Sequence, residues 1–311
     1  MNITITGNLG SGKSSVCKEL AAAGFTIISA GDIFREIAKE KGMTVIELNE
    51  AAKKDRSIDD MLDARSTQLG KTMDHTVFDS RLAWHFVEKS FKVFLMVDMQ
   101  EAARRVFDGS SRGAEVYQDR AEALGGLKAR AGLEKERFLE LYGLDYYDAR
   151  NYDLVLESTC ASPAQLAQEI QRNFELYQKQ PFSAKVECNL CCLYPSVPFA
   201  AIDPDRLAQI CQEETEENQT LCAGGVFGVR EKDGYYYLEQ GHHRALGAAA
   251  AGKVFAQVGS ICLGEQQEAA QLSIQDMEAY EQAGKFRYAA NPVQLPKKDG
   301  YMVDFSRVFT G

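Results

Sequence analysis

The chain has 311 residues, of which 45% are hydrophobic and 26% are charged, the balance of an ordinary soluble protein with room for two domains. Its formal net charge of −10, from 35 basic and 45 acidic residues, excludes a strongly basic nucleic-acid-binding protein, and we expect no stable nucleic-acid binding. No apolar stretch is long enough to cross a bilayer, and the opening MNITITG reads as a strand rather than a signal peptide. We therefore expect a cytoplasmic protein that does not bind membranes.

Short apolar runs alternate with longer amphipathic segments in the first half. Strands are expected at Asn2–Thr6, Phe25–Ser29, Thr76–Asp79, Val93–Val97 and Leu154–Glu157. Helices are expected at Lys13–Ala23, Ile33–Lys41, Val45–Lys54, Ile58–Gly70, Arg81–Glu88, Glu101–Phe107, Glu115–Leu141 and Pro163–Tyr177. This alternation predicts an α/β fold in which a parallel sheet carries helices on both faces.

The pattern changes near Gln178–Pro181, which we take as the boundary between a first domain at 1–178 and a second at 179–311. Beyond the boundary we expect a hairpin of Ala223–Arg230 and Tyr235–Leu238, joined by a turn that contains Asp233-Gly234. The other elements expected there are helices near Arg206–Asn218, His243–Ala251 and Ile274–Ala283 and a strand at Val254–Leu263. They predict a smaller α+β domain with a C-terminal tail.

The segment GNLGSGKS, at Gly7–Ser14, matches the phosphate-binding pattern G-x-x-x-x-G-K-[ST] between an expected strand and an expected helix. Glycines let the main chain approach phosphate oxygens, and N–H groups at the helix start point at the anion. Lys13 would bridge the β- and γ-phosphates of ATP, Ser14 would ligate Mg²⁺, and Ser15 would donate to the α-phosphate. The alternative is a glycine-rich turn that precedes a helix by chance. The predicted nucleotide-binding residues are Gly7, Gly10, Ser11, Gly12, Lys13, Ser14 and Ser15.

A second polar segment, Ser29–Arg35, follows the next expected strand. Asp32 and Arg35 would share one helix face at the carboxyl end of that strand, where ligands bind in open α/β sheets. Arg35 suits an acceptor phosphate because a guanidinium can hold phosphate through two parallel hydrogen bonds. The alternative is a capped surface helix with an ion pair between these two side chains.

The first 177 residues resemble the archaeal-type cytidylate kinases and the cytidylate kinase-like proteins of bacteria. The resemblance is carried by Ser29–Arg35 (S-A-G-D-x-F-R), Ile58–Arg65 (I-D-x-x-L-D-x-R), Val77–Trp84 (V-x-x-x-R-L-A-x-W), Tyr142–Asp148 (Y-G-L-D-x-x-D) and Tyr152–Thr159 (Y-D-L-V-L-x-S-T). It implies ATP- and Mg²⁺-dependent phosphoryl transfer to a nucleoside monophosphate, CMP or dCMP, giving the diphosphate.

The resemblance also implies roles for single residues. Arg35 and Arg81 would hold the acceptor phosphate, and Asp153 would contact the acceptor nucleoside. Asp79 would order Mg²⁺ through water, beside Ser14. The full implied substrate-binding set, in which Asp63 and Arg65 lie on the acceptor-binding helix and Asp32 positions the acceptor phosphate, is Asp32, Arg35, Asp63, Arg65, Arg81 and Asp153.

Phosphoryl transfer needs two anionic substrates held in line and positive charge around the moving group. The arginines available after the fourth strand are Arg104, Arg105, Arg112, Arg120, Arg130 and Arg137. Arg130 and Arg137 lie seven residues apart on one helix face, and Arg112 lies in a glycine-containing stretch suited to a lid. The residues assigned to catalysis are Lys13, Asp32, Arg112, Arg130 and Arg137.

The sequence departs from the family in two places. Asp79-Ser80-Arg81 stands where the family usually has E-G-R or G-G-R, and residues 108–126 hold fewer arginines than usual.

In the second half, Gly241-His-His-Arg244 follows an expected strand and opens an expected helix. The segment resembles the D-G-H-H-R signature of the ParB/sulfiredoxin-like fold, with Gln240 in place of the aspartate. The resemblance implies an anion site at Gly241, His242, His243 and Arg244. In the alternative, the histidines cap the helix and pack against the hairpin. Two other functions stay open: a small-molecule kinase of the free-serine type in this half, or a nucleotide sensor that uses the P-loop.

Three of the eight cysteines lie together at Cys188, Cys191 and Cys192. A C-x-x-C-C cluster can contribute to a zinc site, but the second ligand pair of a zinc motif is missing. We therefore expect reduced thiols and no structural metal.

Overall fold

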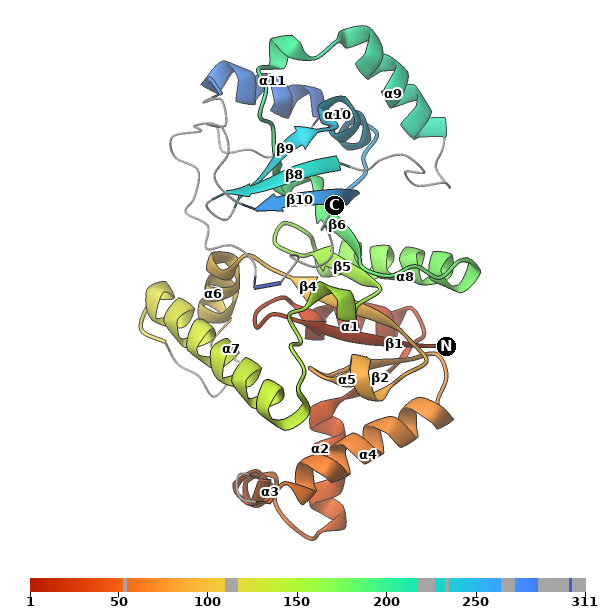
Figure 1. Cartoon of the computed structure of the whole chain (residues 1–311), viewed down its shortest axis with the longest axis vertical. Coiled ribbons are helices and arrows are strands. Elements are labelled where there is room, and N and C mark those ends of the chain that lie inside the picture. The colour runs from red at the N-terminus through yellow and green to blue at the C-terminus, as the bar shows by residue number, and fades with distance from the viewer. Residues whose placement is uncertain are drawn as a thin grey trace.

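The computed structural model describes residues 1–52, 55–109, 117–216, 227–232, 235–263, 272–284 and 302–303. The first half contains a parallel sheet with strand order β2-β3-β1-β4-β5. Figure 1 shows the first half of the chain below the second. Its strands are β1 (Asn2–Gly7), β2 (Thr26–Ser29), β3 (Thr76–Asp79), β4 (Ser90–Met96) and β5 (Leu154–Glu157). The predicted parallel α/β arrangement of this half is confirmed.

Helices cover both faces of this sheet. The helices of the first half are α1 (Lys13–Ala22), α2 (Ala30–Glu40), α3 (Val45–Ala52), α4 (Ser57–Thr72), α5 (Ala83–Phe86), α6 (Met99–Asp108), α7 (Arg120–Tyr142) and α8 (Pro163–Lys179). In β5, Leu154 and Leu156 pack into the core beneath α1 and α8, while Val155 packs into the opposite core beneath α7. Both faces are buried because successive strand side chains point to opposite sides.

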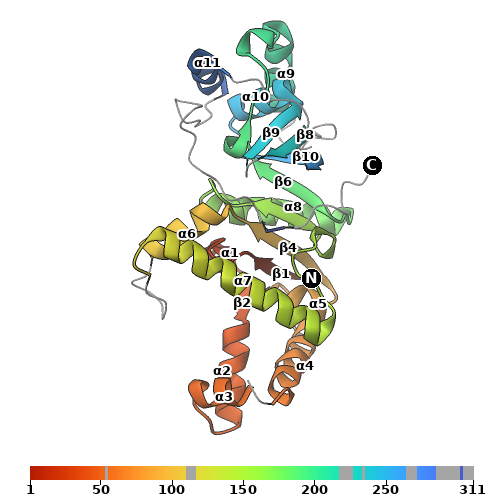
Figure 2. The same ribbon diagram turned by 60° about the vertical axis from the view of Figure 1, so that its left-hand side comes forward.

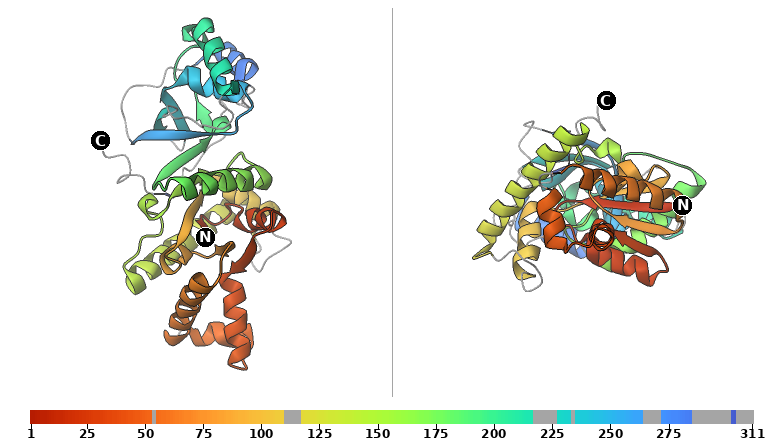
Figure 3. Two further views of the ribbon diagram at one scale, coloured as in Figure 1. Left: turned by 90° about the vertical axis from the view of Figure 1, so that its right-hand side faces the viewer. Right: turned by 90° about the horizontal axis from the view of Figure 1, so that it is seen from below.

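Helices α2, α3 and α4 project from the end of the molecule that lies opposite the second half (Figures 2 and 3). They enclose a small core of their own around Ile33, Ile37 and Leu48. Helix α2 begins with a capping box, in which the Ser29 side chain accepts from the Asp32 N–H and the Asp32 carboxylate accepts from the Ser29 N–H. These local hydrogen bonds set the turn from β2 into α2.

The second half extends the same sheet. Strand β6 (Lys185–Asn189) pairs parallel with β5 and antiparallel with β10 (Phe255–Leu263), and the order continues β6-β10-β8-β9-β7. The remaining elements are β7 (Leu193–Tyr194), β8 (Phe227–Lys232), β9 (Tyr235–Gln240), α9 (Pro204–Glu216), α10 (His242–Ala250) and α11 (Ile274–Gly284). One hydrophobic core joins Tyr152 of the first half to Val186 and Val229 of the second. The sheet and this core therefore both cross residue 178.

Several elements differ from the sequence-based expectation. The sequence does not indicate β6 or β7, which are short strands whose partners are distant in sequence. The helix expected at Arg81–Glu88 is reduced to α5, and β8 and β9 form the expected antiparallel hairpin. Residues 110–116 and 217–226, which include Arg112 and parts of three expected elements, lie outside the described residues. None of the helices in the described parts combines the length and apolar character needed to cross a bilayer.

Candidate active site

The loop between β1 and α1 packs tightly against the rest of the sheet. Gly10 has φ of 78°, and a Cβ at this position would lie 2.9 Å from the Ala102 Cα on α6. A Cβ at Gly7 would lie 2.4 Å from the Leu95 carbonyl oxygen on β4. Only glycine fits at both positions, so the loop backbone keeps the shape that presents its N–H groups at the start of α1.

Buried polar atoms of this loop lack partners within the described structure. Both side-chain atoms of Asn8 and the hydroxyl of Ser11 are buried and make no hydrogen bond there. Buried polar groups without partners are costly and rare in native proteins. A bound anion could accept from the two donors among these atoms, the Asn8 amide N–H and the Ser11 hydroxyl, so the residues present fit a bound polyphosphate.

Lys13 lies at the centre of a charged cluster. Burial, together with repulsion from Arg81, lowers the pKa of the Lys13 ammonium from 10.5 to about 8. The carboxylates of Asp79, at the end of β3, and Glu134, on α7, act in the opposite direction. The cation is thus partly desolvated and incompletely neutralised, a state that a bound phosphate would relieve.

Arg81 connects the loop to α7. Its Nε donates to the Glu134 carboxylate at 2.9 Å, and its Nη1 donates to the Gly7 carbonyl at 3.2 Å. Glu134 also accepts from Arg130 Nε at 3.0 Å. The structure therefore brings together five residues of the cluster: Lys13, Asp79, Arg81, Arg130 and Glu134. Sequence reasoning missed Glu134, because only the fold reveals that it lies between two arginines.

Asp32 and Arg35 form an exposed ion pair of 2.7 Å on the first turns of α2. Hydrogen bonds from Ser29 and then from Arg35 lower the pKa of Asp32. This is the local arrangement that the helix-capping alternative anticipates. It leaves the Arg35 guanidinium on the surface, with 61% of its side chain exposed, and so accessible to a ligand.

Of the other predicted acceptor residues, Asp63 and Arg65 lie on α4, whereas Asp153 lies beside β4. Arg65 is held by Glu40 of α2 at 2.9 Å, and Asp63 accepts from the Tyr142 hydroxyl at 2.8 Å. Asp153 precedes β5 and accepts from the Lys92 N–H at 2.8 Å. That places Asp153 at the amino edge of the parallel sheet, whereas the phosphate loop follows the carboxyl end of β1. The geometry therefore does not unite Asp153 with the loop.

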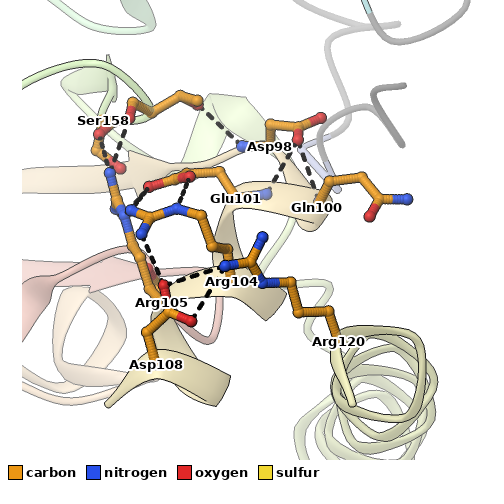
Figure 4. A network of polar contacts seen from close by, with 10 residues as sticks. Asp98, Gln100, Glu101, Arg104, Arg105, Asp108, Arg120 and Ser158 are labelled. Atoms are coloured by element: carbon orange, nitrogen blue, oxygen red, sulfur yellow. Dashed lines mark hydrogen bonds and ion pairs between the residues drawn. The ribbon is translucent and has the colours of Figure 1, made fainter. Parts of the chain in front are cut away.

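A cleft of about 560 Å³ lies beside the loop, between α6 and the segment that leads into α8. Arg105 forms one wall, and donates to the Gly10 carbonyl and to the carbonyls of Ser158 and Thr159. Figure 4 shows how Glu101 receives both Arg104 and Arg105, while Arg104 also reaches Asp108. These two arginines are among the sequence candidates, but spacing alone does not reveal which of them contacts the loop.

The predicted anion site of the second half is occupied by hydrogen bonds within the protein. Gly241 caps α10 with φ of 91°. His242 accepts from the Ser196 N–H at 3.2 Å, and burial, then His243, lower its pKa to about 4. His243 accepts from the Asp203 N–H at 2.8 Å. The histidines therefore bond to neighbouring segments, and neither side chain caps α10; Arg244 is half-buried.

A phosphate loop that opens α1, with a lysine and an arginine directed at it, defines a P-loop phosphotransferase. The model of the Cytidylate kinase-like family matches residues 2–160, and the chain belongs to that family. A cytidylate kinase of Natronomonas pharaonis is 36% identical over 166 residues, which cover 52% of this chain and 83% of that protein. A cytidylate kinase of Methanobrevibacter smithii is 30% identical over 171 residues, which cover 55% and 96%. The chain is therefore a nucleoside monophosphate kinase, and the family match stops before the second half.

Proposed function

We propose that the chain transfers the γ-phosphoryl group of ATP to CMP or dCMP, giving ADP and the corresponding diphosphate. The observation that carries the proposal is that Lys13 and Arg81 meet at the loop. The similarity to the two cytidylate kinases supports it. A sensor that had lost catalysis would need only the loop and Lys13. A second cation, supplied by a different strand end, suits a second anionic substrate.

In this proposal, the loop N–H groups and Lys13 hold the β- and γ-phosphates of ATP, and the cleft lined by Arg104 and Arg105 takes its nucleoside. Ser14 and Asp79 would hold Mg²⁺, which neutralises charge on the transferred group and leaves most of its coordination to phosphate oxygens and water. No cluster of three or more metal-ligating side chains occurs among the described residues.

Arg35 and Arg81 would hold the acceptor phosphate. An oxygen of that phosphate forms a bond to the γ-phosphorus, and the bond from the γ-phosphorus to the oxygen bridging it to the β-phosphorus breaks. Glu134 now neutralises both Arg81 and Arg130, so an arriving phosphate competes with it for these guanidiniums. Arg130 would then be free to turn toward the transferred group, because charge-assisted bonds to phosphate are strong.

The direct test is ADP release measured with CMP, dCMP, UMP, AMP, GMP and free serine as acceptors. CMP or dCMP should give the highest kcat/KM. Arg35→Ala and Arg81→Ala should each raise the acceptor KM by about 10-fold or more, the loss of a charged hydrogen bond, with little change in the ATP KM. If either variant raised the ATP KM and spared the acceptor, the two substrates would be assigned to the wrong sides.

The free-serine arm tests the alternative, in which the second half is a ParB/sulfiredoxin-like unit with its own kinase activity or the P-loop half acts as a sensor. If the protein phosphorylated serine in the absence of any nucleoside monophosphate, the kinase activity would be assigned to the second half. Arg244→Ala should then lower serine turnover, whereas it should leave CMP turnover unchanged if our proposal is right.

A further inference from the structure

Glu134 of α7 holds two arginines that come from different parts of the fold. Its Oε2 accepts from the Arg81 Nε at 2.9 Å, and its Oε1 accepts from the Arg130 Nε at 3.0 Å. The Glu134 side chain is 21% exposed and that of Arg81 is 18% exposed, so this ion pair is only weakly screened by solvent. Both oxygens of one carboxylate are therefore engaged by cations that the proposed reaction uses.

The Glu134 carboxylate is held in its charged form. Burial acts to raise the pKa of Glu134, but Arg81 and then Arg130 outweigh burial and leave this pKa below its usual value. Without substrate, Glu134 thus offers the two guanidiniums what a phosphate would offer, an anion whose oxygens accept charge-assisted hydrogen bonds.

The two arginines differ in how firmly they are fixed. The Arg81 carbonyl accepts from the Trp84 Nε1 at 3.1 Å, and the Arg81 Nη1 donates to the Gly7 carbonyl at 3.2 Å. These contacts keep Arg81 beside the phosphate loop. The Arg130 side chain is 50% exposed, so it can leave Glu134 without opening the core.

Another arginine of α7, Arg137, is held elsewhere. It donates to Asp59 of α4 at 2.7 Å, whereas Arg130 shares the Glu134 carboxylate with Arg81. A ligand that binds Arg81 and a cation on α7 are thus linked through a single carboxylate.

We propose that Glu134 is a positioning residue that holds Arg130 away from the γ-phosphate of ATP until an acceptor phosphate at Arg81 displaces it, an inference that rests on the proposed function. Before an acceptor binds, water has access to the γ-phosphate. If water attacked, its oxygen would bond to the γ-phosphorus, the bond to the β–γ bridging oxygen would break, and ADP, phosphate and a proton would be released. An arginine that reaches the transferred group speeds phosphoryl transfer by about 10³- to 10⁵-fold. Holding Arg130 on Glu134 therefore keeps this hydrolysis slow.

The acceptor phosphate is a stronger ligand for the arginines than Glu134 is. A phosphate monoester carries a charge of roughly −1.5 to −2 at neutral pH and three acceptor oxygens, whereas a carboxylate carries one charge on two oxygens. When the acceptor takes Arg81, Glu134 loses its more buried partner, and Arg130 becomes free to stabilise the transferred group. The acceptor thus releases the cation that its own phosphorylation needs.

The test measures ATP hydrolysis without an acceptor and phosphoryl transfer to CMP, both in the full-length protein. Glu134→Gln removes the charge but keeps the shape, and Glu136→Gln makes the same change at an exposed residue two positions along α7. Glu134→Gln should raise hydrolysis by about 10-fold or more, the effect of one charge-assisted hydrogen bond from Arg130, and should lower the KM for CMP because no carboxylate competes. Glu136→Gln should match the wild type in both assays. A purely structural role of Glu134 would instead lower both rates together.

Unchanged or lowered hydrolysis in Glu134→Gln, or an equal rise in Glu136→Gln, overturns the inference and leaves the kinase activity standing. A wild-type protein that phosphorylates no nucleoside monophosphate overturns the proposed function and this inference with it. Thermal denaturation checks that each variant is folded. If Glu134→Gln does not fold, the wild type decides: cytidine with inorganic phosphite, which supplies an anion for Arg81, should raise ATP hydrolysis above the rate with cytidine alone. No increase with phosphite overturns the inference.

Discussion

Replacing Lys13 by methionine should make the nucleotide-free protein more stable and abolish its activity. One pKa unit corresponds to about 1.4 kcal/mol, so the fall from 10.5 to about 8 bounds the cost of charging Lys13 in the folded chain at roughly 3 kcal/mol. The Lys13 side chain is only partly withdrawn from solvent, and water screens the cost. We therefore expect Lys13→Met to raise the free energy of unfolding by about 1–2 kcal/mol at pH 7.

The sign of the pH dependence follows from the lowered pKa. The folded chain binds the Lys13 proton less readily than the unfolded chain, so the penalty is fully present below pH 8. It fades as pH rises toward 10.5, and the gain in Lys13→Met should fade with it. Urea denaturation of both proteins at pH 7 and above pH 10 measures this difference. A variant less stable than wild type at pH 7 would refute the reasoning, because Lys13 would then be making a structural contact.

Activity supplies the second half of the same test. Lys13→Met should lower kcat by about 100- to 1000-fold or more, since it removes a cation directed at developing charge. ATP should raise the thermal midpoint of the wild type more than that of the variant, because a ligand that binds the folded state more tightly stabilises it more. A folded variant with near wild-type turnover would show that this loop is not the active site.

Two further predictions concern the fold around the site. Burial, with Asp59 and Asp60 nearby, raises the pKa of Asp63 to about 6, so the stability that its protonated form contributes is fully present below pH 3.8 and is lost as pH rises through 6. After allowance for partial exposure, the free energy of unfolding of Asp63→Asn should therefore gain about 1 kcal/mol relative to wild type between pH 4 and pH 7. Urea denaturation measures this change, and a difference independent of pH would contradict the assignment. A chain that ends at residue 178 should be less stable and prone to associate, because it leaves the β5 edge at Leu154–Leu156 unpaired where β6 now binds. A monomer with the full-length thermal midpoint would instead show that the first half is an autonomous domain.

The elements that could be predicted from the sequence are those formed by residues adjacent in the chain. The Gly7–Ser14 loop, the capping turn at Ser29–Asp32 and the alternation of strands with helices each depend on neighbours in the chain, and local rules describe them. These were enough to predict the parallel sheet and the position of the loop at its carboxyl edge.

Contacts between segments far apart in the sequence became visible only in the folded structure. Glu134 lies 53 residues from Arg81, and Arg137 lies 78 residues from Asp59, so no local pattern marks either pair. Strand β6 follows the predicted boundary yet joins β5, because an open sheet edge gains hydrogen bonds from any strand that reaches it. Asp153 shows the converse: its sequence segment suggests a ligand contact, but strand direction places it at the opposite edge of the sheet from the loop.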